Sequence, residues 1–279
     1  MKQYVTPKGY HYKMRGGKKV RISQEDKVVY SPNLLIIVDV QNDFVNHDLF
    51  KKDSKVRVVQ KMVDNICKKI IRCAKDKKNK WHFVLSRDYH PTGHCSHELF
   101  GKHCLYGDKG SEINSKIVST LKSLCSEGTI NENDIEIVYK GFNMNTDSFG
   151  VIPYHHSYYK KRMSDVFGVD GCSPKLKKDN IKYTGGFSLR KNSDIHFMGN
   201  IKNKDIYPYF TKKRFPKLIN IEACGLVADY CVMDTCINAT FMFPKSKVVF
   251  LEKLTVWLLN KPSDTKKVLK EYGVVISSM

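Results

Sequence analysis

Six short apolar runs rich in β-branched residues recur along the chain, and segments with helical periodicity lie between several of them. The runs cover residues 34–39, 82–87, 135–140, 218–224, 247–251 and 273–277. Consecutive parallel strands need a crossover between them, so this alternation is typical of a parallel sheet covered by helices on both faces. The sequence therefore predicts an α/β fold with three layers (α/β/α) and a mostly parallel six-stranded sheet.

The first crossover carries the clearest helical signal. Apolar residues recur there at spacings of three and four, namely Val59, Val63, Ile66 and Ile70. That spacing forms one apolar stripe on a helix. Residues 111–124, 229–241 and 264–272 are the other predicted helices, and Pro262 and Ser263 are the start signal of the last. With 279 residues and 41% hydrophobic content, the chain can bury a sizeable core.

Two stretches depart from the alternation. Residues 1–30 are predicted to be a basic N-terminal extension, and residues 151–215 an insertion without sustained periodicity inside a single domain spanning 31–279. Together they hold +15 of the formal net charge of +20, and the rest of the chain is nearly balanced. A lysine-rich solvated surface is the favoured explanation, and contact with nucleic acid is the alternative.

Three reactive side chains stand where predicted strands end. Asp39 ends the first strand, Lys140 ends the third, and Cys231 follows the fourth at the start of a helix. An amine beside a thiol stabilises the thiolate, and unpaired N–H groups at a helix start can hold an oxyanion. The structural alternatives are a turn aspartate, a solvated lysine and a buried cysteine.

Potential metal ligands gather after the second strand. Four of them fall within sixteen residues: Asp88, His90, His94 and His103. A carboxylate with neutral imidazoles suits zinc, iron or manganese with open positions. Other donors between them are alternative ligands: Cys95, His97 and Cys104.

Four motifs, read in order, resemble those of nicotinamidases among the isochorismatase-like cysteine hydrolases. They are Val-Asp-Val-Gln-Asn-Asp-Phe, Asp-Tyr-His-Pro-x-x-His, Tyr-Lys-Gly and Gly-Leu-Val-Ala-Asp-Tyr-Cys-Val, and the likeness covers residues 33–150 and 216–279. The resemblance implies the isochorismatase-like hydrolase fold. It also implies an amidohydrolase that converts nicotinamide to nicotinic acid and ammonia through a cysteine thioester, as in NAD salvage.

The resemblance implies a role for each motif. Asp39, Lys140 and Cys231 become the catalytic triad, and the N–H groups of Val227 and Cys231 the oxyanion hole, shaped by a cis peptide between Leu226 and Val227. A divalent metal, with zinc favoured over iron and manganese, would be held by Asp88, His90, His94 and His103 and would bind the pyridine nitrogen.

The resemblance also implies pocket-lining positions. Substrate would be bound by Phe44, Phe100, Leu226 and Tyr230, with Asp147 as a further candidate. The chain departs from the pattern at Phe100, where many relatives have tryptophan, and at Gly101, where proline is usual. These departures concern the shape of the pocket and leave the triad unchanged.

Other expectations concern location and partners. Nine cysteines and a polar N-terminus without a secretory segment predict an intracellular, cytoplasmic protein with free thiols, and no apolar run is long enough to cross a membrane. The expected partners are nicotinamide and, in a homo-oligomer, further copies of the chain. One alternative is a related hydrolase of another amide, carbamoyl or isochorismate-like substrate. The other is a nucleic-acid-binding or scaffold protein with an inactive hydrolase domain.

Overall fold

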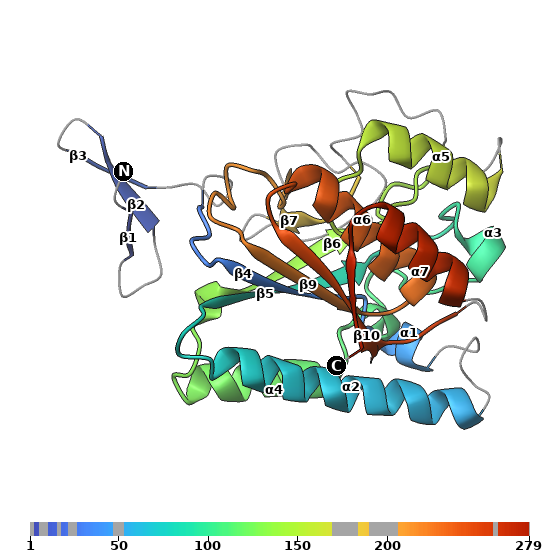
Figure 1. Ribbon diagram of the computed structural model, residues 1–279, viewed down its shortest axis with the longest axis horizontal. Coiled ribbons are helices and arrows are strands. Elements are labelled where there is room, and N and C mark those ends of the chain that lie inside the picture. The colour runs from blue at the N-terminus through green and yellow to red at the C-terminus, as the bar shows by residue number, and fades with distance from the viewer. Residues whose placement is uncertain are drawn as a thin grey trace.

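An eight-stranded sheet of order β11-β10-β9-β4-β5-β6-β7-β8 forms the centre of the molecule (Figure 1). The computed structural model describes residues 3–5, 11–15, 18–21, 27–46, 53–168, 184–189, 206–258 and 262–278. The strands are β4 (Asn33–Val38), β5 (Trp81–Asp88), β6 (Ile135–Lys140), β7 (Phe187–Leu189), β8 (Ile206–Pro208), β9 (Asn220–Gly225), β10 (Lys247–Thr255) and β11 (Val275–Ser277). Neighbours from β11 to β6 are parallel, whereas β7 and β8 are antiparallel.

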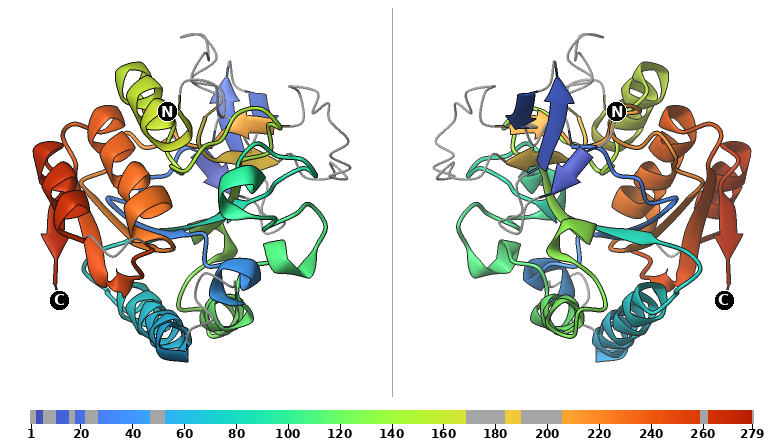
Figure 2. Two further views of the ribbon diagram at one scale, coloured as in Figure 1. Left: turned by 90° about the vertical axis from the view of Figure 1, so that its right-hand side faces the viewer. Right: turned by 90° about the vertical axis from the view of Figure 1, so that its left-hand side faces the viewer.

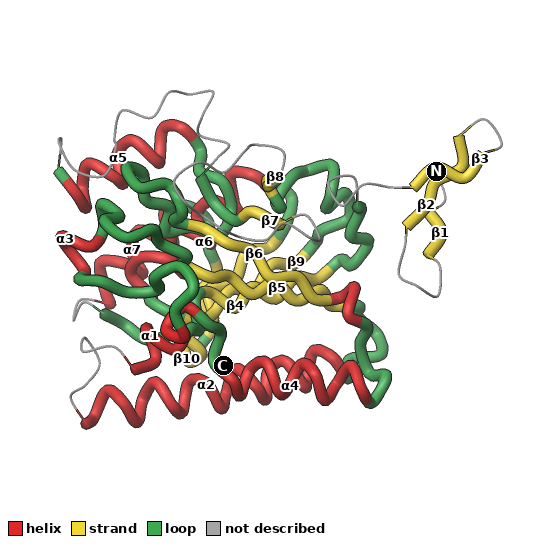
Figure 3. Tube along the Cα trace, turned by 180° about the vertical axis from the view of Figure 1, so that it is seen from behind, coloured by secondary structure: helices red, strands yellow, loops and turns green. Residues whose placement is uncertain are grey.

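Helices cover both faces of this sheet, which confirms the three predicted layers. On one face lie α2 (Asp53–Ala74) and α4 (Ser115–Ser126), and on the other α5 (His156–Phe167), α6 (Met233–Met242) and α7 (Pro262–Glu271) (Figures 1, 2 and 3). Side chains of β4 alternate between the two cores. Leu34 and Ile36 pack with the α6 side, and Leu35 and Ile37 with the α2 side.

The predicted strand count was too low. The segment 151–215 contributes α5, β7 and β8, and β7 extends the sheet by pairing antiparallel with β6. The two extra strands are three residues each, too short for a periodic signal. In α5 the buried face includes Tyr158 and Tyr159, whose phenol rings are apolar but whose hydroxyl groups mask the hydrophobic pattern.

The first part of the chain forms a small sheet of its own. Strands β1 (Gln3–Val5), β2 (His11–Arg15) and β3 (Lys18–Arg21) pair antiparallel in that order. This sheet shares no strand with the central one, and the division at residue 30 stays a prediction.

Among the described residues, none of the helices combines the length and the apolar character that crossing a bilayer requires. Seven described cysteines carry free thiols. Cys95 is disulfide-bonded, which departs from the expectation of free thiols throughout.

Candidate active site

Four neighbouring parallel strands, β9, β4, β5 and β6, bring the predicted site residues to one edge of the sheet. In register, Val38 of β4 pairs with Gly225 of β9, and Asp88 of β5 pairs with Lys140 of β6. Asp39 follows β4 directly. Parallel strands direct their carboxyl ends to the same edge, and ligands of such sheets bind there.

Lys140 is the centre of this site. Its side chain is fully buried, and its Nζ atom lies 2.9 Å from Asp39 Oδ2 and 2.5 Å from Asp88 Oδ1. The same atom lies 3.7 Å from Cys231 Sγ. The four residues come from four segments of the sequence, and the structure places the triad predicted from the motifs in direct contact.

Burial and the charges of the neighbouring side chains together set the pKa values in this cluster. Burial raises the pKa of Asp39, and the ammonium of Lys140 offsets only part of that effect. Burial likewise raises the pKa of the Cys231 thiol, against the lowering effect of Lys140. Burial would lower the pKa of Lys140, but the carboxylates of Asp39 and Asp88 outweigh it and hold that pKa well above its usual value. The resting site therefore contains an ammonium beside a protonated thiol.

The backbone around Cys231 is irregular. A π-helical turn, Ala228–Val232, carries the cysteine and runs into α6. The peptide between Leu226 and Val227 is cis, as the resemblance implied. Just before it, Gly225 has a φ of +118°, and a Cβ atom there would lie 2.1 Å from the Val38 carbonyl oxygen. Only glycine allows β9 to approach β4 this closely.

Asp39 is held in one orientation by a neighbouring strand. It has a φ of +48°, and its N–H donates to Ser86 Oγ at 3.1 Å. The Ser86 hydroxyl donates in turn to Asp39 Oδ1 at 2.6 Å. One carboxylate oxygen thus faces Ser86, and the other faces Lys140.

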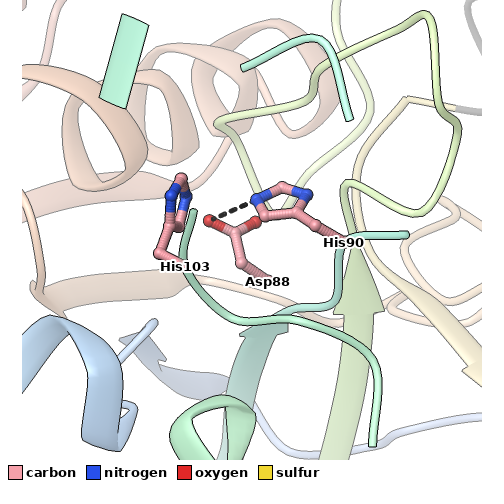
Figure 4. Close-up of side chains that lie close together, drawn as sticks. All are labelled: Asp88, His90 and His103. Atoms are coloured by element: carbon pink, nitrogen blue, oxygen red, sulfur yellow. Dashed lines mark ion pairs between the residues drawn. The ribbon is translucent and has the colours of Figure 1, made fainter. Parts of the chain in front are cut away.

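The second cluster consists of Asp88, His90 and His103, whose donor atoms lie within 4.8 Å of one another (Figure 4). The Nδ1 atoms of His90 and His103 lie 2.6 and 2.8 Å from the carbonyl oxygens of Gly141 and Gly101. A carbonyl only accepts, so each Nδ1 carries the proton and each Nε2 has a lone pair for a metal. The donor set fits zinc, iron or manganese.

The fourth predicted ligand lies beside this group. The ring of His94 stacks on that of His90 with a centroid distance of 4.0 Å, but the three-residue group does not include it. Burial lowers the pKa of His94 to about 4, so its imidazole is neutral. The alternative ligands differ: the His97 ring faces His103 at 5.7 Å, the Cys104 thiol is buried, and Cys95 is disulfide-bonded.

Gly141 allows His90 to approach the end of β6. Its φ is +66°, and a Cβ atom there would lie 2.5 Å from Cε1 and 2.8 Å from Nδ1 of His90. We expect Gly141→Ala to displace that imidazole and to weaken zinc binding by roughly 10-fold to 100-fold. Titration of the metal-free protein with zinc measures the loss. Gly128→Ala, which has a similar φ of +70° but no atom within 4 Å of the added carbon, is the control. Equal zinc affinities for both variants would contradict the expectation.

A pocket opens beside Cys231. Its lining residues are Phe44, Asp88, Phe100, His103, Asp147, Phe149, Val227, Tyr230, Cys231 and Leu258. Asp39 and Lys140 do not line it, because their side chains have no exposed surface. A molecule in the pocket can therefore reach the thiol, Asp88 and His103, whereas the side chains of Asp39 and Lys140 are shielded from water.

Most of the residues predicted to bind substrate line this pocket. Phe44, Phe100, Tyr230 and Asp147 line it, and so do the two residues of the predicted oxyanion hole. Leu226 does not. Its side chain is completely buried in the core on the α2 side, so its part in the site is the cis peptide. Burial raises the pKa of Asp147 to about 6, although the Ser148 N–H donates to its carboxylate.

Sequence reasoning missed several residues of the site. Phe149 and Leu258 line the pocket, Ser86 orients Asp39, and Gln41 holds the end of β5 by bonding both backbone groups of Asp88. Only Gln41 had a signal, since it lies within the first motif. The others come from segments whose proximity to the site depends on the fold.

Solved structures share this fold at low sequence identity. A pyrazinamidase of Pyrococcus horikoshii in complex with zinc is 14% identical with a TM-score of 0.53, and the match covers 89% of this chain and 99% of that one. The yeast nicotinamidase is 17% identical with a TM-score of 0.52, covering 88% and 100%. PnC1 from L. infantum in complex with nicotinate is 18% identical with a TM-score of 0.50, covering 90% and 94%.

At the level of sequence, no protein-family model and no curated protein matches the chain. The structural likeness therefore establishes the fold that these enzymes share.

Proposed function

We propose that this chain is a metal-dependent cysteine amidohydrolase acting on nicotinamide. The contact of the Lys140 ammonium with both Asp39 and Cys231 carries the proposal. It combines a nucleophile that lines a largely apolar pocket with a buried proton carrier and a buried cation. Support also comes from the shared fold, whose other members include an enzyme bound to nicotinate and one bound to the inhibitor nicotinaldehyde.

The chemistry follows from the positions of the proton-carrying groups. Asp39 takes the proton of the Cys231 thiol, and the sulfur attacks the carboxamide carbon. Because burial raises the pKa of Asp39, this carboxylate is a stronger base than an exposed one. The proton passes to the departing nitrogen, so ammonia leaves and a thioester remains. Water then adds to the thioester, giving the carboxylic acid and restoring the thiol.

Two further groups complete the proposed site. The N–H groups of Val227 and Cys231 hold the negative oxygen of the tetrahedral intermediate. A divalent cation held by Asp88, His90 and His103 would supply a Lewis acid that binds the pyridine nitrogen. Phe44, Phe100 and Tyr230 enclose the flat ring, so the carboxamide is directed at the sulfur.

Ammonia release from nicotinamide tests the proposal directly. The assay includes pyrazinamide, benzamide and a carbamoyl amino acid, each with and without a chelator. Isochorismate contains no nitrogen, so its hydrolysis is measured by the release of pyruvate. Turnover of nicotinamide that far exceeds turnover of benzamide, and is lost with chelator, supports the proposal, since only pyridine binding requires the metal. Preference for the carbamoyl compound or isochorismate would favour a related hydrolase with another substrate.

An inactive hydrolase domain on a nucleic-acid-binding protein is the remaining candidate. The charge of the segments 1–30 and 151–215 motivates it. It predicts no turnover of any amide together with steeply salt-dependent binding to DNA or RNA. The same preparation of protein serves both measurements.

Removal of the Ser86 hydroxyl group should shift the pH profile of activity. Its hydroxyl lowers the pKa of Asp39, which burial has raised, so Ser86→Ala should raise that pKa further. Asp39 must be ionised to accept the thiol proton, so activity falls as the pH drops through this pKa. We expect the acid limb of kcat/KM to move up by about one pH unit, the value of one hydrogen bond to a charged group.

Ser188→Ala is the matched control for this shift. Ser188 is also buried and donates to a carboxylate, Glu136, outside the pocket. Its acid limb should coincide with that of the unmodified protein. An unchanged limb in Ser86→Ala would mean that Asp39 does not control the acid side of the profile.

A further inference from the structure

The helix α5 lies outside the segments whose sequence resembles nicotinamidases, residues 33–150 and 216–279, yet it packs against the active site. It stands on the same side of the sheet as α6, the helix that follows Cys231 (Figure 1). Its buried residues are Tyr158, Tyr159 and Met163. Beside them, Arg162 has a side chain only 14% exposed. An arginine buried to this extent needs specific partners.

The guanidinium of Arg162 holds the chain on both sides of the nucleophile. Its Nε donates to the two carboxylate oxygens of Asp234 at 3.1 and 3.2 Å. One terminal nitrogen donates to the Asp229 carbonyl oxygen at 2.7 Å. These partners come two residues before and three residues after Cys231. One rigid cation therefore fixes the π-helical turn that carries the sulfur.

The Asp234 end of this contact is itself fixed. The carboxylate has no exposed surface and also accepts hydrogen bonds from the hydroxyl groups of Tyr154 and Tyr158, at 2.5 and 2.7 Å. At the other end, the Asp229 side chain accepts from the N–H of Leu258, which lines the pocket. Arg162 thus belongs to a buried network that connects α5 to two walls of the pocket.

The same guanidinium also lies over two aromatic rings of the pocket wall. Its Cζ atom is 5.1 Å from the ring centre of Tyr230 and 5.6 Å from that of Phe149, within the range of cation–π attraction. Both rings line the pocket. One turn further along α5, Phe167 stacks on Phe149 with an interplanar angle of 10° and a centroid distance of 5.7 Å.

We infer that Arg162 is a positioning residue of the active site, which sets both the placement of the Cys231 sulfur and the aromatic wall that receives a planar substrate. The part of the inference that concerns the aromatic wall rests on the proposed function, because it assumes an aromatic amide as substrate. The part that concerns placement of the Cys231 sulfur assumes no particular substrate. Arg162 itself does not line the pocket and touches no reacting atom.

Arg162→Met keeps the length of the side chain and removes its charge and its hydrogen bonds. Two quantities should change: the rate at which iodoacetamide alkylates Cys231, followed on the peptide by mass spectrometry, and the KM for nicotinamide. Displacement of a reacting group by an ångström costs on the order of 100-fold, so we expect alkylation to slow, and KM to rise, by roughly 10-fold to 100-fold. Arg162→Lys keeps the positive charge over the rings but loses the several N–H donors of the guanidinium. Compared with Arg162→Met, it should therefore restore KM more fully than the alkylation rate.

Arg214→Met controls for loss of a buried arginine as such. Arg214 is 2% exposed, and its Cζ atom lies 4.6 Å from the ring centre of Tyr209, away from the residues that line the pocket. Urea unfolding should show losses of stability in both methionine variants, but only Arg162→Met should change alkylation and KM. Equal kinetic losses in the two variants would overturn the inference, as would an unchanged alkylation rate in folded Arg162→Met.

The design separates this inference from the proposed function. If Arg162→Met does not fold, Arg162→Lys decides alone, and unchanged alkylation and KM there would reject the positioning role. If the unmodified protein releases no ammonia from nicotinamide, the proposed function fails, while alkylation still reports on the sulfur. Slower alkylation in the Arg162 variants would then support its placement by α5 without reference to any substrate.

Discussion

Cys231→Ala should abolish ammonia release from nicotinamide while leaving the protein folded. The Cys231 sulfur lies on the pocket surface and in contact with Lys140, and a thiolate is a strong nucleophile toward a carbonyl carbon. Loss of a nucleophile that acts together with its partners lowers kcat by roughly 10⁴-fold or more. Ammonia release under saturating substrate measures the loss, and binding of nicotinic acid to the variant shows that the pocket persists.

Cys236→Ala is the matched control. This cysteine lies five residues further along, in α6, with no exposed surface and no place in the pocket lining. Its removal should lower stability by the amount that a small buried cavity costs and should leave turnover close to that of the unmodified protein. Measurable turnover by Cys231→Ala at the level of Cys236→Ala would remove the thioester mechanism.

Lys140→Met should produce the second large effect, on both stability and activity. The substitution leaves the buried carboxylates of Asp39 and Asp88 side by side without their cation. Breaking a buried ion pair in this way costs about 3–5 kcal/mol of the free energy of unfolding. The missing ammonium no longer stabilises the thiolate, so kcat should fall by roughly 10²-fold to 10³-fold. Urea unfolding and ammonia release measure the two losses separately.

Lys69→Met is the control that separates the loss of stability from the loss of activity. Lys69 forms an ion pair with Glu222, and their side chains are 9% and 15% exposed, but neither residue lines the pocket. It should lose stability without a matching loss of turnover. If Lys140→Met kept full turnover under conditions in which it is folded, Lys140 would be a structural cation and the proposed proton transfer would need another arrangement.

The shared position of Asp88 adds a consequence for these variants. Its carboxylate contacts Lys140 through Oδ1 and lies 3.8 Å from His90 Nε2 through Oδ2. The candidate metal site and the proposed triad are therefore not independent, since one side chain belongs to both. The loss in Lys140→Met includes any change that the freed Asp88 imposes on His90 and His103.

The local sequence determined the parts of this protein that lie at strand ends. Apolar runs predicted β4, β5, β6, β9, β10 and β11 to within a few residues, because burial on both faces of a parallel sheet requires continuous apolar sequence. Asp39, Lys140 and Cys231 followed from that placement, since the carboxyl ends of parallel strands lie at one edge. The clustering of Asp88 and three histidines within sixteen residues indicated a metal site, whereas the cis peptide followed only from the resemblance.

Tertiary structure alone decided what surrounds those residues. Ser86, Phe149 and Leu258 carry no local pattern, because their roles depend on contacts between segments far apart in the chain. The helix α5 escaped prediction because its tyrosines are polar by sequence, and the Tyr158 hydroxyl group meets its buried partner, Asp234, only in the folded chain. A local sequence pattern indicates which residues are buried, whereas the fold determines which of them are in contact. Arg162 contacts Asp229 and Asp234 only in the folded chain.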